Sequence, residues 1–254
     1  MKVAFLASGP KVKVFAHRGL ATEVPENTVA AFEAAIAAGA DYIETDLWVS
    51  ADGEAVICHD PNLDSYGISG VELAKTSWAE LAEIDLGSGV KLVTLDGLLS
   101  HFPTTRFNID LKVISALPSV LKVIEKHQAA DRVLLASFSE ATLAQIKLQA
   151  PHIARSAGPN TVILSRIYTL FGLKKALTKL LDGVAALQIP PNKSIINLST
   201  KRFIRQVQAA GTEVHYWTIN APAQALKLLD KGADGIVSDR VDLIIPALLQ
   251  AGLR

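Results

Sequence analysis

The sequence predicts an α/β protein that folds as a (β/α)₈ TIM barrel. Short runs of apolar and β-branched residues alternate with longer segments of helical character, and eight such units follow one another. Strands that alternate with helices indicate a parallel sheet, and eight units indicate a closed barrel. A chain of 254 residues is long enough for one such barrel. We therefore expect a single domain over residues 1–254, with residues 60–95 as a small insertion after the second strand.

Each expected element has a place in this alternation. The expected barrel strands are Val12–Ala16, Tyr42–Val49, Phe107–Leu111, Val133–Ser137, Ile153–Ser156, Ala185–Ile189, Val214–Thr218 and Gly235–Val237. The clearest expected helices are Asn27–Ala38, Ser115–His127, Glu140–Gln149, Thr200–Ala210, Ala223–Lys231 and Leu243–Gln250. A further extended segment is expected at Ala55–Cys58, a helix at Ser77–Ile84 in the insertion, and a small plug strand beneath the barrel at Val3–Leu6.

The composition argues against several classes of function. Lys plus Arg and Asp plus Glu both total 25, so the net charge is zero and indicates neither nucleic-acid binding nor a polybasic membrane patch. The single cysteine, Cys58, cannot form an internal disulfide. The apolar run near the N-terminus is short for an export signal and lacks a cleavage site, and no segment approaches ~20 uninterrupted apolar residues. We expect a cytoplasmic protein without a transmembrane segment.

Chemically useful side chains gather between residues 15 and 60. Glu44 and Asp46 are two residues apart on an apolar strand, so they point to the same face. Two buried carboxylates are costly unless a cation or a proton compensates for them, which indicates a metal site. His17 and His59 each follow an extended segment, and the active sites of TIM barrels lie at the carboxyl ends of their strands.

The motifs resemble those of the glycerophosphodiester phosphodiesterase family, in the order in which that family carries them. They are His17-Arg18-Gly19, Pro25-Glu26-Asn27-Thr28, Glu44-x-Asp46, His59-Asp60, Asn108-Ile109-Asp110-Leu111-Lys112, Val214 to Asn220 and Gly232 to Ile236. The resemblance spans about residues 12 to 245. It implies an enzyme, a phosphoric diester hydrolase that releases sn-glycerol 3-phosphate and an alcohol from a small glycerophosphodiester.

The resemblance and the residue types together predict a divalent metal site. Glu44, Asp46 and Asp110 supply three hard oxygen ligands, which suit Mg²⁺ or Ca²⁺. The family usually has a glutamate at the position of Asp110, so this ligand is one methylene shorter. The alternative is that Asp110 only pairs with Lys112.

The other predicted site residues handle protons and phosphate. Arg18 and Lys112 would neutralise the phosphodiester. The resemblance makes His17 the base and His59 the acid, with the neighbouring glycerol hydroxyl as the nucleophile, activated by the cation, and a cyclic phosphate as the intermediate. Trp217 is expected to form an apolar wall for the glycerol carbons, although a tryptophan on a strand is often only part of the core.

Further candidates support the site or lie at its edge. Glu26 and Asn27 are expected to brace the His17-Arg18-Gly19 loop, with Asn27 able to cap the first helix. His215 fits the filling layers of the barrel, and Asp239 fits either the rim of the site or the cap of the last helix.

Residues 161 to 181 allow two interpretations. Apolar residues recur there at near-helical spacing, beside Lys174, Lys175 and Lys179. The segment is either the fifth barrel helix or an amphipathic flap that touches lipid or a lipid-like substrate tail. The second interpretation allows peripheral lipid contact and a lysophospholipase D-like activity as an alternative function.

A non-catalytic binding barrel is disfavoured, because both histidines and all three acidic positions are filled. The oligomeric state is left open.

Overall fold

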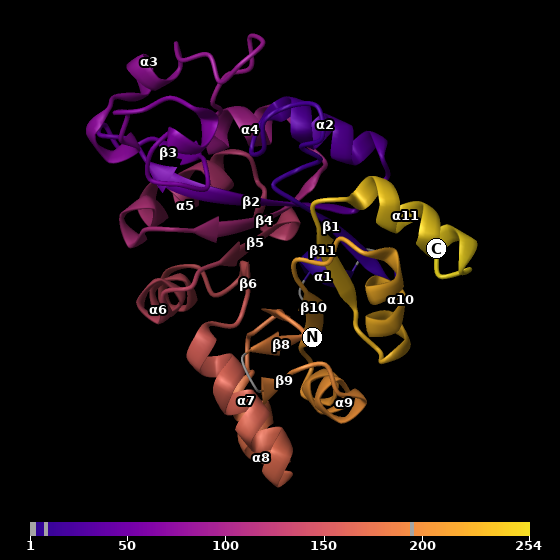
Figure 1. Cartoon of the computed structure of the whole chain (residues 1–254). Coiled ribbons are helices and arrows are strands. Elements are labelled where there is room, and N and C mark those ends of the chain that lie inside the picture. The colour runs from indigo at the N-terminus through magenta and orange to yellow at the C-terminus, as the bar shows by residue number, and fades with distance from the viewer. Residues whose placement is uncertain (1–3, 8–9, 194–195) are drawn as a thin grey trace.

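The protein is a nearly closed barrel of eight parallel strands surrounded by helices (Figure 1). The computed structural model describes residues 4–7, 10–193 and 196–254. The barrel strands are β1 (Lys13–His17), β2 (Tyr42–Val49), β4 (Arg106–Leu111), β5 (Val133–Ala136), β6 (Ala154–Arg155), β7 (Ala186–Ile189), β10 (Glu213–Tyr216) and β11 (Gly235–Ser238). The TIM-barrel prediction is confirmed, and every predicted barrel strand is found within one or two residues of its expected ends.

The register of the strands brings the two ends of the chain together. The sheet runs β6-β5-β4-β2-β1-β11-β10-β7, so the first and last strands are neighbours, and Ala16 lies opposite Ser238. The remaining gap, between β6 and β7, is bridged by a parallel pair, Ser156 and Ala186. Residues that follow these strands therefore meet at one end of the barrel.

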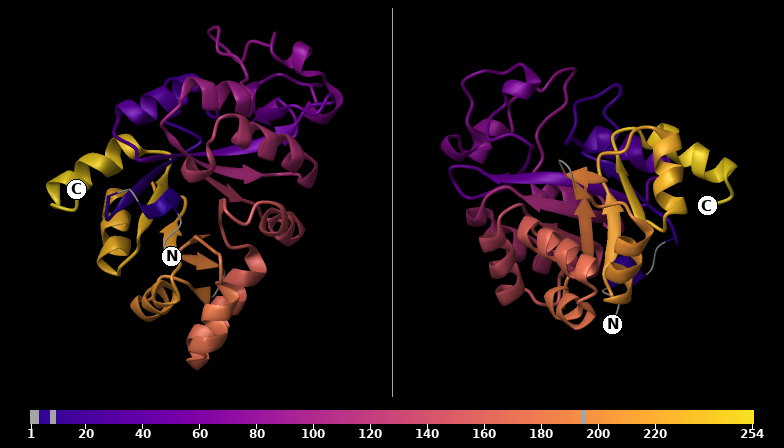
Figure 2. Two further views of the ribbon diagram at one scale, coloured as in Figure 1. Left: turned by 180° about the vertical axis from the view of Figure 1, so that it is seen from behind. Right: turned by 60° about the horizontal axis from the view of Figure 1, so that its bottom comes forward.

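Helices cover the outside of the barrel on all sides (Figure 2). They are α2 (Val29–Ala37), α4 (Leu95–His101), α5 (Leu117–Lys126), α6 (Glu140–Gln149), α7 (Pro159–Phe171), α8 (Lys174–Leu180), α9 (Lys201–Ala209), α10 (Pro222–Asp230) and α11 (Val241–Gln250). Short 3₁₀ turns occur at Asp64–Tyr66, Leu73–Lys75, Ile114–Ala116 and Ala130–Arg132. The six clearest predicted helices are all present, and α6 has its predicted ends.

The barrel is closed at the amino-terminal ends of its strands by a helix rather than by the predicted strand. Residues Ala4–Ala7 form α1, and Phe5 is fully buried against Tyr42, with ring centroids 5.1 Å apart. The prediction of a strand at Val3–Leu6 is therefore wrong for its described part, while Val3 lies outside the described residues. A helical turn can pair some of its own backbone groups, whereas a lone strand inside the barrel could pair none of them within itself.

Residues after β2 form a small lobe beside the barrel. β3 (Ala55–Ile57) runs antiparallel to β2, and α3 (Trp78–Leu81) begins with a capping box between Ser77 and Glu80. The lobe has its own buried apolar cluster, formed by Val56, Cys58, Leu63, Leu73, Leu81, Leu86 and Leu92. Its role for the site is that β3 leads directly to His59.

Other differences from the expected elements are local. Residues 161 to 181 form two helices instead of one, because Gly172 adopts a left-handed φ of 69° that ends α7. Helix α4 and a two-stranded hairpin of β8 (Asn192–Lys193) and β9 (Ile196–Asn197) were not expected. In the part of the chain that the structure describes, no helix is long and apolar enough to cross a membrane.

Candidate active site

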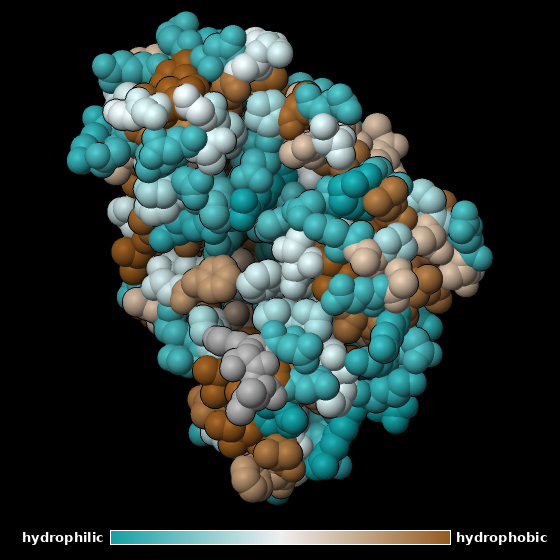
Figure 3. All heavy atoms as spheres, viewed as in Figure 1, coloured by the Kyte–Doolittle hydropathy of each residue, from teal (hydrophilic) through white to brown (hydrophobic). Residues whose placement is uncertain are grey.

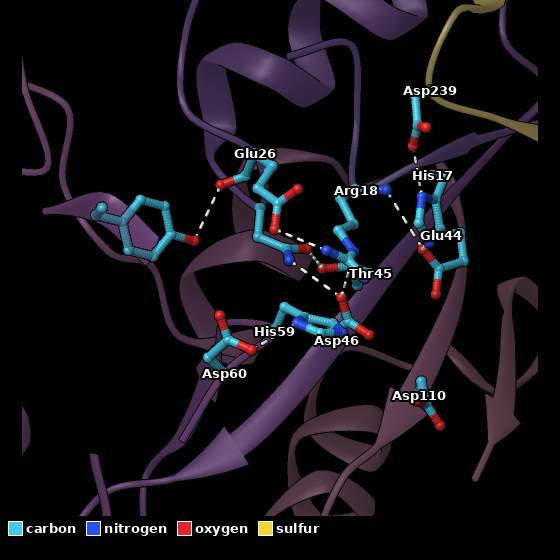
Figure 4. A network of polar contacts seen from close by, with 12 residues as sticks. His17, Arg18, Glu26, Glu44, Thr45, Asp46, His59, Asp60, Asp110 and Asp239 are labelled. Carbon is cyan, nitrogen blue, oxygen red and sulfur yellow. Dashed lines mark hydrogen bonds and ion pairs between the residues drawn. The ribbon is translucent and has the colours of Figure 1, made fainter. Parts of the chain in front are cut away.

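A cavity of about 360 Å³ opens at the carboxyl ends of the barrel strands. Figure 4 shows the polar network on one side of this cavity. The residues predicted for catalysis, metal binding and substrate binding all line it, namely His17, Arg18, Glu44, Asp46, His59, Asp110, Lys112 and Trp217. The sequence prediction thus identified residues that the fold gathers around one space.

The turn after β1 has an unusual backbone. Arg18 has a φ of 58° and Gly19 a φ of 88°, both in the left-handed region. A Cβ atom at Gly19 would lie 2.7 Å from the backbone of Ala31 in α2, so only glycine fits this contact. The Arg18 amide donates to the Glu44 carbonyl oxygen at 2.9 Å. The turn is therefore locked onto both β2 and α2, and it holds His17 and Arg18 at the cavity.

Adjacent strands bring the three predicted metal ligands together. Glu44 and Asp46 lie on β2, and Asp46 is opposite Asp110 of β4 in the parallel register. Lys112 Nζ lies 2.7 Å from Asp46 Oδ1 and 2.7 Å from Asp110 Oδ2. The alternative pairing of Asp110 with Lys112 is thus present for one oxygen. The other, Asp110 Oδ1, is buried and has no hydrogen-bond partner among the described residues.

The buried carboxylates are short of positive charge. Burial raises the pKa of Glu44 well above its ordinary value, and the nearby Asp46 charge raises it further. Burial likewise raises the pKa of Asp110, although Lys112 acts in the opposite direction. A hard divalent cation would compensate for these charges and would satisfy the orphaned oxygen of Asp110.

The residues fit a cation in donor type and in burial, but they are not preassembled around one. Within residues 4–7, 10–193 and 196–254, no three His, Cys, Asp or Glu side chains are grouped as metal ligands. The ammonium group of Lys112 lies between Asp46 and Asp110. Cation binding by Glu44, Asp46 and Asp110 would therefore compete with Lys112 for the same oxygens.

Each of the two histidines is paired with an aspartate through Nδ1. His17 Nδ1 lies 2.6 Å from Asp239 Oδ1, and His59 Nδ1 lies 2.8 Å from Asp60 Oδ1. Burial alone would lower the pKa of His17, but the Glu44 charge and the hydrogen bond with Asp239 outweigh it and raise the pKa above 6.5. With Nδ1 bound to a carboxylate, Nε2 of each ring is the nitrogen that can exchange a proton with a substrate.

The predicted supporting residues contact other predicted site residues, in part differently from what was expected. Glu26 Oε1 accepts a hydrogen bond from Arg18 Nη1 at 2.9 Å. Asn27 does not cap α2; the cap is Thr28, whose side chain accepts from the Ala31 amide. Asn27 has a φ of 56°, whereas a capping residue has an extended backbone. The side-chain amide of Asn27 instead donates to Asp46 Oδ2 at 3.1 Å.

The opposite side of the cavity is mainly apolar. Trp217 and Phe138 meet edge to face with ring centroids 6.0 Å apart, and Pro159, Val162, Ile189 and Leu198 extend this wall. Trp217 is thus part of the cavity wall. His215, in contrast, is fully buried inside the barrel and bonded to Glu213.

Three residues escaped the predicted set of site residues: Asn108 and Gln188 line the cavity, and Asp239 contacts His17. Asp239 was recognised only as a rim or cap residue, and its contact with His17 follows from the pairing of β1 with β11. Asn108 donates to Gln188 at 3.2 Å, and Asn108 Oδ1 and Gln188 Nε2 are buried without a partner among the described residues. Asn108 precedes Asp110 by two residues on β4, so the strand period could have indicated it.

Comparisons with known proteins show the family of this chain. The sequence model of the "Glycerophosphoryl diester phosphodiesterase family" matches residues 17–243. A Mycobacterium tuberculosis protein named "Probable glycerophosphodiester phosphodiesterase 2" is 34% identical over 98% of this chain and 95% of its own. A human lysophospholipase D is 26% identical over 89% of this chain and 83% of its own.

A solved structure provides the same fold with a bound product. The Oleispira antarctica phosphodiesterase, in complex with the product sn-glycerol-3-phosphate, is 29% identical with a TM-score of 0.75, and the match covers 93% of this chain and 96% of that one. The family is generally dependent on a divalent metal. The chain therefore belongs to the glycerophosphoryl diester phosphodiesterase family, as the motifs indicated, and is a phosphodiesterase of that family.

Proposed function

We propose that the cavity hydrolyses glycerophosphodiesters to sn-glycerol 3-phosphate and an alcohol, with His17 and His59 as the acid–base pair. The observation that carries this proposal is that two carboxylate-bound histidines line one cavity together with Arg18 and Lys112. The Oleispira antarctica relative was solved with the same product. A non-catalytic barrel would have no use for this combination of groups.

In the proposed first step, His17 acts as the base and His59 as the acid. With its Nδ1 proton held by Asp239, neutral His17 has a free lone pair on Nε2 and can take the proton of the glycerol hydroxyl next to the phosphate. As the hydroxyl oxygen bonds to phosphorus, the bond to the leaving alcohol breaks, and His59 gives that alkoxide a proton. The products are the free alcohol and a cyclic glycerol phosphate.

In the second step the two histidines exchange roles. His59, now neutral, takes a proton from a water molecule that attacks the cyclic phosphate, and His17 returns its proton to the departing glycerol oxygen. One water molecule is consumed, and both histidines regain their starting protonation states. Asp239 and Asp60 stabilise whichever ring is positively charged at each stage.

The charge of the phosphate requires cationic groups. Arg18, held by Glu26 and Asp46, and Lys112 supply two of them. A divalent cation, Mg²⁺ or Ca²⁺, would be held by Glu44, Asp46 and Asp110 and would stabilise the negative charge that develops on the phosphate oxygens.

A lysophospholipase D-like reaction is the second candidate, and the apolar wall of the cavity favours it. Phe138, Val162 and Leu198 offer an acyl chain contacts that a glycerol backbone alone would not use. A human relative carries the name of that activity. The chemistry at phosphorus would be the same in both cases, so only the size of the substrate separates the two candidates.

The cytoplasmic location expected from the sequence stays a prediction.

The test is an assay of three substrates, glycerophosphocholine, glycerophosphoethanolamine and lysophosphatidylcholine. Purified enzyme is treated with a chelator, and Mg²⁺ or Ca²⁺ is then added back while choline or ethanolamine release is measured. We expect release to stop on chelation and to return with one of the two cations. Full activity in excess chelator would contradict the metal site, and turnover of lysophosphatidylcholine alone would favour the second candidate.

A further inference from the structure

Helix α7 exposes an apolar face to solvent. Its exposed residues Ile163, Leu164, Ile167, Leu170 and Phe171, followed by Leu173, form what we call the apolar ridge. The first five recur at the spacing of one helix face. Phe171 is 70% exposed and Leu170 is 55% exposed. In Figure 3, hydrophobic residues gather at the lower end of the molecule, where Figure 1 places α7 and α8.

The ridge is not the side of α7 that packs on the protein. That side carries Val162, Ser165 and Thr169, which are buried. The neighbouring helix α9 follows the usual rule, because its packed side is apolar and its outer side exposes Lys201, Arg202 and Arg205. Helix α7 is thus apolar where a surface helix is normally polar, and a contiguous exposed apolar patch of this kind indicates an interaction site.

The segment that carries the ridge is also basic. Residues 159–181 contain Arg166, Lys174, Lys175 and Lys179 and no Asp or Glu, although the whole chain has a net charge of zero. The three lysines are exposed on α8, directly after the ridge, and none of them forms an ion pair within the described part of the chain. Apolar side chains next to unpaired lysines are the pattern of surfaces that enter the interface of an anionic bilayer.

A second copy of the chain would be a poor occupant of this face. In a two-fold contact between ridges, the lysines of α8 would find no acidic partner in the ridge segment of the other copy, because residues 159–181 contain no Asp or Glu. Anionic lipid head groups satisfy both properties of the surface, because they pair with the lysines while the acyl region takes up the apolar side chains.

The same helix reaches the active site. Pro159 and Val162, at the start of α7, line the catalytic cavity. We infer that the apolar ridge and the lysines of α8 dock this enzyme onto an anionic lipid bilayer, with the mouth of the cavity close to the membrane surface. This inference concerns a surface outside the catalytic residues, so it can be tested without any measurement of phosphodiester cleavage.

The test is flotation of the purified full chain with lipid vesicles. Vesicles of phosphatidylcholine alone are compared with vesicles of equal parts phosphatidylcholine and phosphatidylglycerol, at low and at high salt. We expect the protein to float with the anionic vesicles and not with the neutral ones, and to be released by salt, because charge attraction to the bilayer is screened.

Two double variants and a matched control locate the binding surface. We expect Leu170→Gln with Phe171→Gln, and Lys174→Glu with Lys175→Glu, each to lower the vesicle partition coefficient by about 10-fold or more. The control is Lys147→Glu with Leu148→Gln on α6, where Leu148 is 75% exposed, and it should bind as the unmodified protein does. All altered side chains are exposed, so circular dichroism and melting curves should be unchanged.

Three outcomes would overturn the inference. One is that the unmodified protein fails to bind anionic vesicles. Another is that the ridge variant binds as well as the control. The third is that sedimentation velocity finds a dimer that the ridge variant dissociates, which would assign the ridge to contact between copies of this chain.

Discussion

The hydrogen bond between His17 and Asp239 allows the proposed roles of both residues to be tested by one substitution. Asp239 Oδ1 lies 2.6 Å from His17 Nδ1, and Asp239 Oδ2 accepts from Asn220 Nδ2 at 2.7 Å. The aspartate is thus held from its other side while it faces the histidine. Replacing it by asparagine keeps its shape and removes its charge, so His17 loses the carboxylate that orients it and stabilises its positively charged form.

The expected size of the effect follows from the type of hydrogen bond. Bonds to a charged partner contribute about 1.5–3 kcal/mol, and 1.36 kcal/mol corresponds to about tenfold in rate. The Asp239 side chain is 48% exposed, so solvent weakens the bond and the lower end of this range applies. We therefore expect Asp239→Asn to lower kcat/KM by about 10-fold, since the charge on His17 develops in the transition state.

The assay is choline release from glycerophosphocholine across a range of pH. His17 must be neutral to act as a base, and its pKa is raised, so the acid limb of the profile should lie above pH 6.5. Asp239→Asn removes one of the interactions that raise this pKa, and the limb should move to lower pH. The control is Asp242→Asn, which breaks an ion pair with Arg240 beyond the catalytic network and should leave kcat/KM within about 2-fold.

A double substitution separates action through His17 from a general structural effect. If Asp239 acts through His17, adding Asp239→Asn to His17→Ala should cause little further loss, because residues that act as a unit are not additive. An unchanged pH profile in Asp239→Asn, or losses that multiply in the double variant, would refute the reasoning.

Three further predictions concern the histidines, the metal site and the barrel interior. His17→Ala and His59→Ala should each lower turnover by at least ~10² with unchanged melting temperature, and near-normal turnover would remove that histidine from the mechanism. Asp110→Asn should weaken Mg²⁺ or Ca²⁺ binding in isothermal titration, because a buried charged ligand is lost; equal affinity would exclude Asp110 as a ligand. Burial alone would raise the pKa of Glu213, but its bond to His215 and the charges of His215 and Lys13 outweigh burial and lower the pKa below 4.5. Glu213 thus stabilises the fold above about pH 4.5, and this contribution is lost as the pH falls through its folded pKa. In urea unfolding, Glu213→Gln should be less stable at neutral pH, with a difference that shrinks below pH 4.5, and a constant difference would contradict this sign.

Much of the barrel could be predicted from the sequence because its strands are buried on both faces. Segments such as Val133–Ala136 are continuous apolar runs, and both ends of Tyr42–Val49 were predicted correctly although it carries Glu44 and Asp46. Short elements were harder. The helix Ala4–Ala7 is too short to show a period, and its apolar letters fit a strand equally well. The break at Gly172 divides a segment whose apolar pattern continues on both sides.

The candidate site was predictable where residues share a strand or a motif. Glu44 and Asp46 face the same way because strand side chains repeat with a period of two, and the order of the motifs pointed to the two histidines that line the cavity. The contact of Asp239 with His17 could not be read from local sequence, since it joins residues 222 positions apart. It depends on the register of β1 with β11, which only the closed barrel fixes. Similarly, the position of Lys112 between Asp46 and Asp110 is set by the pairing of β2 with β4.

The most direct test of the proposed function is phosphorus NMR of glycerophosphocholine during turnover by the purified enzyme with added Mg²⁺ or Ca²⁺. Attack by the neighbouring hydroxyl is intramolecular, where effective molarities can reach ~10⁵ M or more, so water should not replace it easily. We predict the signal of a cyclic glycerol phosphate followed by sn-glycerol 3-phosphate, with free choline, and no reaction of the 2-deoxyglycerol analogue. Formation of phosphocholine and glycerol would contradict the assignment of the cleaved bond, and hydrolysis of the 2-deoxy analogue at a comparable rate would contradict the internal nucleophile.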